Sequence, residues 1–254
     1  MILKKGDNFK NNFFAYNNII KRSVDPQQYD YADINWNPYE KNLFSPVRRL
    51  MFNNIEKYIQ ETNNLNVLDV GCGTGWLLEE IDKYKPNYLK GIDSSEANVE
   101  IAKRKMPKFH FECVDFGRYK VKSRFDHIYS IMTLSHFENL FEFFKKCSGM
   151  MNIGKIIIIV PDYNYFKRPK KDQKIDLFFF EDDCYAINIE KKGKKISQVV
   201  RKNIIYHDLA NKNGFYLLEE LGIRPDDKFL LESSKDVEKE EVMFNLLVYK
   251  KNGR

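Results

Sequence analysis

Short apolar runs alternate with amphipathic segments along the chain from about residue 65 onward. The apolar runs predict buried strands, and the segments between them have the apolar spacing of helices. The expected strands are residues 66–70, 88–92, 109–114, 125–131 and 155–160, and the expected helices follow residue 75, run from a serine cap at 94 or 95 to residue 105, and cover 138–150. Strand after helix after strand predicts parallel pairing through right-handed crossovers, and therefore an open α/β sheet.

Further elements are expected after the fifth strand. They are a hairpin formed by residues 184–190 and 195–202 with Gly193 in its turn, a helix at 206–213 that ends before Gly214, and an antiparallel strand pair at 215–221 and 242–250. The three phenylalanines at 178–180 are expected to provide the hydrophobic seat of the hairpin. The polar stretch 224–241 is expected to be a loop because it lacks helix signals.

The chain shows no internal repeat and no linker, so we expect one domain with an amino-terminal cap. Residues 1–62 are expected to form this cap from helices and loops, because they show no strand pattern. Residues 63–254 form the main domain, with the hairpin inserted at about 163–203.

The composition narrows the class of protein. Hydrophobic residues make up 43% and charged residues 31% of the 254 residues, which excludes global disorder. The longest aliphatic run, residues 156–160, is far shorter than the about twenty residues that cross a bilayer. The amino terminus turns polar too early for a secretory signal, and the four cysteines form no C-x-x-C pair. We therefore expect a cytoplasmic protein without a membrane span, a disulfide framework or a zinc site.

The net charge of +6 changes this picture little. Its excess comes mostly from dispersed lysines, and the densest clusters, residues 167–174 and 191–195, are expected to be solvated loops. No separate nucleic-acid-binding module is indicated.

The candidate chemistry begins at the loop Gly71-Cys72-Gly73-Thr74-Gly75, between the first strand and its helix. Glycines at alternate positions let the backbone approach a ligand closely, and the free amides of the next helix point toward it. The spacing fails the G-x-G-x-x-G fingerprint of dinucleotide binding, and no Gly-Lys-Ser/Thr follows for a Walker phosphate loop.

The stretch Val67-Leu68-Asp69-Val70-Gly71-Cys72-Gly73-Thr74-Gly75 resembles motif I of the class I S-adenosylmethionine-dependent methyltransferases. The resemblance implies their α/β Rossmann-like fold, with a mostly parallel seven-stranded sheet and an antiparallel carboxyl-terminal strand pair. It implies S-adenosyl-L-methionine as cofactor and S-adenosyl-L-homocysteine as product. No metal is expected, because the four histidines lack the spacing of metal ligands.

The resemblance also implies roles for residues at the strand ends. Asp93 would hold the ribose hydroxyls, Asp115 the adenine amino group, and Phe116 would lie against the base. Ser130 ends the stretch that resembles motif IV and would meet the methionine part, whereas Asp69 would stiffen the glycine loop. The cofactor-binding residues expected are Arg48, Asp69, Gly71, Cys72, Gly73, Gly75, Asp93, Ser94, Asp115, Phe116 and Ser130.

Arg48 enters through a second resemblance. Trp36-Asn37-Pro38 and Ser45-Pro46-Val47-Arg48 are similar to a pattern that precedes motif I in the ubiquinone-biosynthesis O-methyltransferases. There the arginine grips the carboxylate of the cofactor, a task that suits a planar bidentate donor. Asn37 and Ser45 depart from the family pattern, and the adjacent Arg49 competes with Arg48 for the role.

The expected acceptor is a small molecule, methylated on oxygen or nitrogen by in-line displacement. His136, just past the fourth strand, is the candidate general base, and Tyr29, Trp36 and Tyr163 are candidates for the wall of the acceptor pocket. The alternatives are an RNA or protein methyltransferase and a non-catalytic adenosyl-binding subunit. The acceptor and the oligomeric state are left open by the sequence.

Overall fold

The computed structural model describes residues 46–137, 139–167, 174–181, 184–191, 194–233 and 237–251. The amino-terminal cap expected at residues 1–62 therefore lies outside the described residues as far as residue 45. Its described part is mostly one helix, α2 (Pro46–Gln60).

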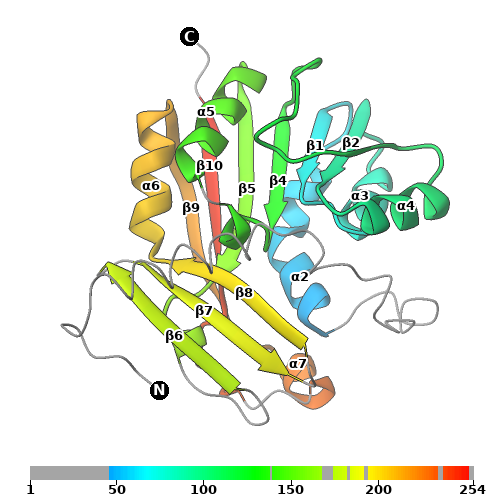
Figure 1. The fold of residues 1–254 in the computed structure, drawn as a ribbon. Helices are drawn as coiled ribbons and strands as arrows, with labels where there is room; N and C mark the ends of the chain where they lie inside the picture. Colours follow the sequence, from blue (N-terminus) through cyan, green and yellow to red (C-terminus); the bar gives the residue numbers. More distant parts are fainter. Residues whose placement is uncertain are drawn as a thin grey trace.

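Seven strands form the main sheet, in the order β3-β2-β1-β4-β5-β10-β9 (Figure 1). Their bounds are β1 (Asn66–Val70), β2 (Tyr88–Asp93), β3 (His110–Cys113), β4 (His127–Ile131), β5 (Gly154–Pro161), β9 (Phe215–Ile223) and β10 (Phe244–Lys251). The strands β1 to β5 pair in parallel, whereas β10 runs antiparallel to both β5 and β9. The structure thus confirms the predicted α/β fold class, with a mostly parallel sheet that ends in an antiparallel pair.

Helices cover both faces of the main sheet. Along β5, Ile156, Ile158 and Val160 belong to the apolar cluster on one face, and Ile157 and Ile159 to the cluster on the other. Successive side chains of a strand point to opposite faces, so a strand covered on both sides must be apolar throughout. The first face is covered by α5 (Leu140–Met150) and α6 (Asn203–Lys212), and the second by α2, α3 (Trp76–Asp82) and α7 (Asp227–Glu232). The helix α4 (Glu96–Lys105) lies against β2 and β3.

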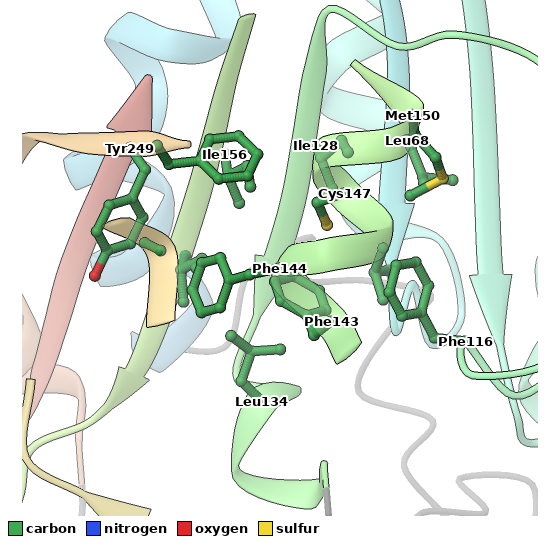
Figure 2. Close-up of a cluster of buried hydrophobic side chains, with 14 of the residues drawn as sticks. Leu68, Phe116, Ile128, Leu134, Phe143, Phe144, Cys147, Met150, Ile156 and Tyr249 are labelled. Atoms are coloured by element: carbon green, nitrogen blue, oxygen red, sulfur yellow. The ribbon is translucent and has the colours of Figure 1, made fainter. Parts of the chain in front are cut away.

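Aromatic rings of α5 fill the centre of the first cluster (Figure 2). Phe143 and Phe144 lie edge to face with their centroids 5.3 Å apart. Phe144 also meets Tyr249 of β10 at 5.7 Å, and Phe143 meets Phe116, after β3, at 5.2 Å. Such ring pairs add ~0.5–1.5 kcal/mol each beyond the burial of their area. They fix α5 between β10 and the segment that follows β3.

A second, antiparallel sheet contains β6 (Lys174–Glu181), β7 (Cys184–Lys191) and β8 (Lys194–Arg201), in that order. It lies across the edge at which β4 and β5 end (Figure 1). The predicted hairpin corresponds to β7 and β8, but its expected hydrophobic seat is itself a strand, with Phe178 opposite Ala186 and Phe179 opposite Tyr185. The third strand pairs the backbone groups that β7 would otherwise leave open on its second edge.

The polar stretch 224–241, expected to be a loop, contains the six-residue helix α7. The side chain of Asp226 caps it by accepting a hydrogen bond from the Phe229 amide at 2.6 Å. Phe229 is fully buried in the cluster that α2 also joins. The cap at Asp226 and the burial of Phe229 stabilise this helix. It is too short for the helical spacing of apolar residues to be recognised in the sequence.

Among the described residues, no helix combines the length and the apolar composition needed to cross a membrane.

Replacement of Phe144 by alanine should lower the free energy of unfolding by about 3–5 kcal/mol, because it leaves a cavity between α5 and β10. Phe141, on the same helix, is 41% exposed. Phe141→Ala is therefore the matched control and is expected to change stability by less than about 0.5 kcal/mol. Urea denaturation of both variants makes the comparison, and equal losses would contradict the burial of Phe144 in the core.

Candidate functional site

The site residues expected from the sequence gather at one edge of the main sheet. The glycine loop follows β1, Asp93 is the last residue of β2, and Asp115 follows β3. Val70 pairs with Ile92, and Asp93 with Cys113, so the ends of these three strands are adjacent. Ligands of open α/β sheets bind at the carboxyl ends of the strands, which is where these residues lie.

The glycine loop opens its backbone toward this edge. Gly71, Gly73 and Gly75 have φ angles of 76°, 53° and 85°. A Cβ atom on Gly71 would stand 2.2 Å from Oγ1 of Thr133, so only glycine lets the loop after β4 pack there. A Cβ atom on Gly73 would meet nothing within 4 Å, so its backbone faces open space. The loop is thus closed against β4 at Gly71 and open to a ligand at Gly73.

The carboxylate of Asp93 ties this loop to β2. The Gly73 amide donates to its Oδ2 at 2.8 Å, and the Ser95 amide donates to its Oδ1 at 2.9 Å. Burial raises the pKa of Asp93, whereas these amides, the Ser94 amide and the Asn98 side chain act against that rise. Ser95 caps α4 through its hydroxyl, and Ser94 is exposed beside the edge.

A second carboxyl group lies within β1, just ahead of the loop. Asp69 is 3% exposed, and its burial, followed by the charge of Asp93, raises its pKa from 3.8 to about 8. The carboxyl group of Asp69 is therefore mostly protonated at neutral pH. Cys72 is buried as well, and its Sγ packs so closely on Gly91 that a Cβ there would stand 2.8 Å from it. Burial raises the pKa of the Cys72 thiol, which fits a packing role for this side chain.

After β3, Asp115 and Phe116 lie in different surroundings. Asp115 is exposed, and its Oδ1 accepts a hydrogen bond from the Gly117 amide at 2.8 Å. Phe116 is 5% exposed, and its ring packs on Phe137. It also packs on Phe143 in the core under α5 (Figure 2). The ring of Phe116 thus belongs to the core, and only the main chain of this residue could contact a ligand.

The segment after β4 carries the candidate base. Ser130, near the end of β4, is fully buried, and its hydroxyl has no hydrogen-bond partner within the described part of the chain. The short helix η2 (Leu134–His136) follows, and Nε2 of His136 lies 3.2 Å from Oγ of Ser135.

Arg201, the last residue of β8, holds this segment from the side of the small sheet. Its guanidinium group donates to the carbonyl oxygens of Leu134, at 3.2 Å, and Phe137, at 2.9 Å. Arg201 is 6% exposed, so these bonds compensate a charge that has left water. The sequence analysis missed Arg201, since a basic residue at the end of a strand was the only signal.

Helix α2 directs its two adjacent arginines to different neighbours. The guanidinium carbon of Arg48 lies 5.7 Å from the ring centroid of Trp76, the first residue of α3. Arg49 instead forms an ion pair with Glu232 of α7. Arg48 is therefore the arginine that lies beside the glycine loop.

A cavity of about 350 Å³ lies where β5 and β8 end. It is lined by Asp162, Tyr163, Asn164, Lys167, Lys202, Asn203 and Asn245. Tyr163, expected to wall the acceptor pocket, lines this cavity, whereas Tyr29 and Trp36 lie outside the described residues. The sequence analysis placed Lys167 in a solvated loop, but its Nζ lies 3.7 Å from the ring centroid of Tyr163.

Two other histidines lie away from this edge. His127, the first residue of β4, is buried, and burial lowers its pKa to about 4. Nδ1 of His207 lies 2.8 Å from the hydroxyl of Tyr249, and its Nε2 lies 3.0 Å from a carboxylate oxygen of Glu220. In the ranges that the structure describes, no group of three or more His, Cys, Asp or Glu side chains could hold a metal ion.

Comparison with known proteins gives concordant matches. A family model described as a methyltransferase domain matches residues 67–154, from β1 to the start of β5. The ubiquinone biosynthesis O-methyltransferase of Coxiella burnetii (strain RSA 331 / Henzerling II) is 28% identical over 207 residues, which cover 76% of this chain and 82% of that protein.

Solved structures share the fold. An S-adenosylmethionine dependent methyltransferase from Mesorhizobium loti matches with a TM-score of 0.65 and 17% identity, over 82% of this chain and 100% of that one. The magnesium protoporphyrin IX methyltransferase of Synechocystis PCC 6803, with bound SAM, matches with a TM-score of 0.54 and 13% identity, over 96% and 98%.

The raised pKa of Asp69 makes stability depend on pH. The folded protein holds a proton on Asp69 up to about pH 8, whereas the unfolded chain releases it near 3.8, so unfolding releases a proton between these values. The contribution of Asp69 to stability is therefore greatest below pH 4 and is lost as the pH rises toward 8.

We expect the stability of Asp69→Asn relative to the unsubstituted protein to rise between pH 5 and 8, by up to about 1.4 kcal/mol per pH unit, because asparagine carries no proton to lose. Urea denaturation across this range measures the difference. A difference that does not vary with pH would mean that Asp69 is ionised in the folded state.

Proposed function

Because the chain is a class I S-adenosylmethionine-dependent methyltransferase, we propose that it transfers the methyl group of this cofactor to an oxygen or nitrogen of a small molecule. The observation that best supports a small-molecule acceptor is the cavity of about 350 Å³ at the same edge of the sheet as the glycine loop. Its volume falls within the range of about 300–1,000 Å³ that is usual for small-ligand sites. The name of the C. burnetii relative, an O-methyltransferase of ubiquinone biosynthesis, also favours a small-molecule acceptor.

The adenosine part is proposed to lie along the glycine loop toward β2 and β3. Asp93 ends β2 beside the open backbone of Gly73, and its carboxylate is proposed to accept the ribose hydroxyls in competition with the donors that already bind it, among them the amides of Gly73 and Ser95. The open space at Gly73 leaves room for this approach, and the exposed carboxylate of Asp115 is free to accept the adenine amino group.

The methionine part is proposed to lie toward α2 and β4. Arg48 suits the carboxylate of the cofactor because its planar guanidinium can bind both oxygens at once, and its stacking on Trp76 places it beside the loop. The hydroxyl of Ser130, which has no hydrogen-bond partner among the described residues, is a further polar group at this end. The carboxyl group of Asp69 is buried just ahead of the loop, and the approach of a cationic ligand would favour its ionised form.

The bound cofactor supplies a methyl group that its sulfonium already activates. What the chain must add is orientation, which can lower a barrier by ~7–11 kcal/mol. The segment after β4 connects the glycine loop with the small sheet, since Thr133 packs on Gly71 and Arg201 holds Leu134. His136 is carried by this segment and is proposed to take the proton of a hydroxyl acceptor, whereas a neutral amine would need no base.

Asp93→Ala is expected to weaken binding of S-adenosylmethionine by more than about tenfold, because hydrogen bonds of ~1.5–3 kcal/mol to the carboxylate are lost. Asp126→Ala is the matched control, since Asp126 also accepts a backbone amide, that of Asn66 at 2.8 Å, but at the opposite edge of the sheet. Isothermal titration calorimetry compares the two variants. Unchanged affinity in Asp93→Ala would remove Asp93 from the cofactor site.

The acceptor class is tested by incubating the protein with methyl-labelled S-adenosylmethionine and a cell extract that is then split into small-molecule, RNA and protein fractions. We expect label in the small-molecule fraction, and less of it with Asp93→Ala at the same limiting concentration of cofactor. Label confined to RNA or protein would replace the proposed acceptor by a macromolecule. Binding of the cofactor without any transfer would instead indicate a non-catalytic subunit.

A further inference from the structure

The cavity at the ends of β5 and β8 has an excess of positive charge. Lys167 and Lys202 both line it, and Asp162 is the one carboxylate among its described lining residues. Oδ1 of Asp162 accepts the amides of Asn164 and Tyr165 at 2.8 and 2.9 Å, and its Oδ2 accepts the side-chain amide of Asn245 at 3.1 Å. These backbone and amide donors, rather than the lysines, are the hydrogen-bond partners of Asp162.

Aromatic rings fix the position of Lys167. Its Nζ lies 3.7 Å from the ring centroid of Tyr163, 5.6 Å from that of Phe179 and 5.7 Å from that of Tyr185. Two of these rings are fixed relative to each other, because the hydroxyl of Tyr185 donates a hydrogen bond to the carbonyl oxygen of Tyr163 at 2.9 Å. A cation over ring faces gains attraction but keeps its N–H donors available for another partner.

Lys202 brings a second ammonium group to the same place. Its Nζ lies 5.4 Å from the centroid of Tyr163, so both lysines meet on one ring. Two like charges over one ring repel each other, and burial, followed by the charge of Lys202, lowers the pKa of Lys167. Such repulsion is relieved when an anion binds between the two groups.

The polarity of α6 acts in the same direction. This ten-residue helix begins at Asn203 on the cavity wall and has no acidic residue in its first turn. The amino-terminal end of a helix carries a partial positive charge that adds to that of the lysines.

The cavity and the glycine loop lie at the ends of two strands of the same sheet. In the main sheet β5 is two places from β1, with β4 between them. Two strand spacings correspond to about 10 Å along the edge. A molecule of one ring with a short substituent spans that distance.

We infer that the methyl acceptor carries an anionic group, a carboxylate or a phosphate, which binds between Lys167 and Lys202 while the nucleophile reaches toward the glycine loop. The identification of this anion with the acceptor rests on the proposed function. The anion site itself rests only on the cavity, its two lysines and the aromatic rings beneath them.

The test is a titration of the full chain with inorganic phosphate, with benzoate and with uncharged benzyl alcohol, followed by NMR at the amides of Asn203 and Asn245. We expect saturable shifts with at least one anion, and binding at least tenfold weaker for benzyl alcohol. Phosphate and benzoate distinguish the two kinds of anionic group. Equal affinity for benzyl alcohol and benzoate, with no response to phosphate, or no saturable shift with either anion, would overturn the inference.

Substitutions locate the site. In Lys167→Met the apolar stem can still cover Tyr163, and this variant and Lys202→Gln should each weaken anion binding at least fivefold. Lys145→Met is the matched control, because Nζ of Lys145 also lies over a ring, that of Phe141 at 6.0 Å, but on the exposed surface of α5. Unchanged anion affinity in both cavity variants would overturn the assignment.

The affinity for S-adenosylmethionine, measured by calorimetry on the same variants, keeps the two proposals separate. It should equal that of the unsubstituted protein in all three variants. Anion binding without cofactor binding would count against the proposed function alone, whereas cofactor binding without anion binding would count against the anion site alone.

Discussion

The hydrogen bond from the Gly73 amide to the carboxylate of Asp93, at 2.8 Å, is the contact on which the site depends. It joins two segments that are twenty residues apart in sequence, the loop after β1 and the end of β2. The same carboxylate receives the Ser95 amide and so fixes the entry to α4. One side chain therefore sets both the shape of the glycine loop and the first turn of the next helix.

The segment after β4 connects this edge to the small sheet. On one side Thr133 packs on Gly71, and on the other Arg201 binds the carbonyl oxygens of Leu134 and Phe137. Buried carbonyl groups need donors, and here the donor comes from β8 instead of the main sheet. A displacement of the small sheet would therefore shift the segment that contains His136 and, through Thr133, the packing of the glycine loop.

The sequence predicts the main sheet and the glycine loop because both arise from local patterns, such as the apolar run 156–160 within β5 and the alternate glycines after β1. The third strand of the small sheet and the helix α7 could not be predicted in this way. Phe178 and Phe179 form a strand only because β7 offers them an open edge, and α7 depends on its cap and on the burial of Phe229. Lys167 resembles any lysine of a charged run, and its place over Tyr163 results from tertiary packing.

The two parts of the site differ in how they are packed. The strand ends that hold the glycine loop belong to the two large clusters of the main sheet, whereas Tyr163 packs with Tyr185, Ile187 and Val200 in a small cluster of its own. Substitutions in that small cluster change the wall of the cavity without changing the core beneath the glycine loop. In the proposed function, acceptor specificity can therefore vary while cofactor geometry is kept, provided that Arg201 continues to hold the segment between the two proposed sites.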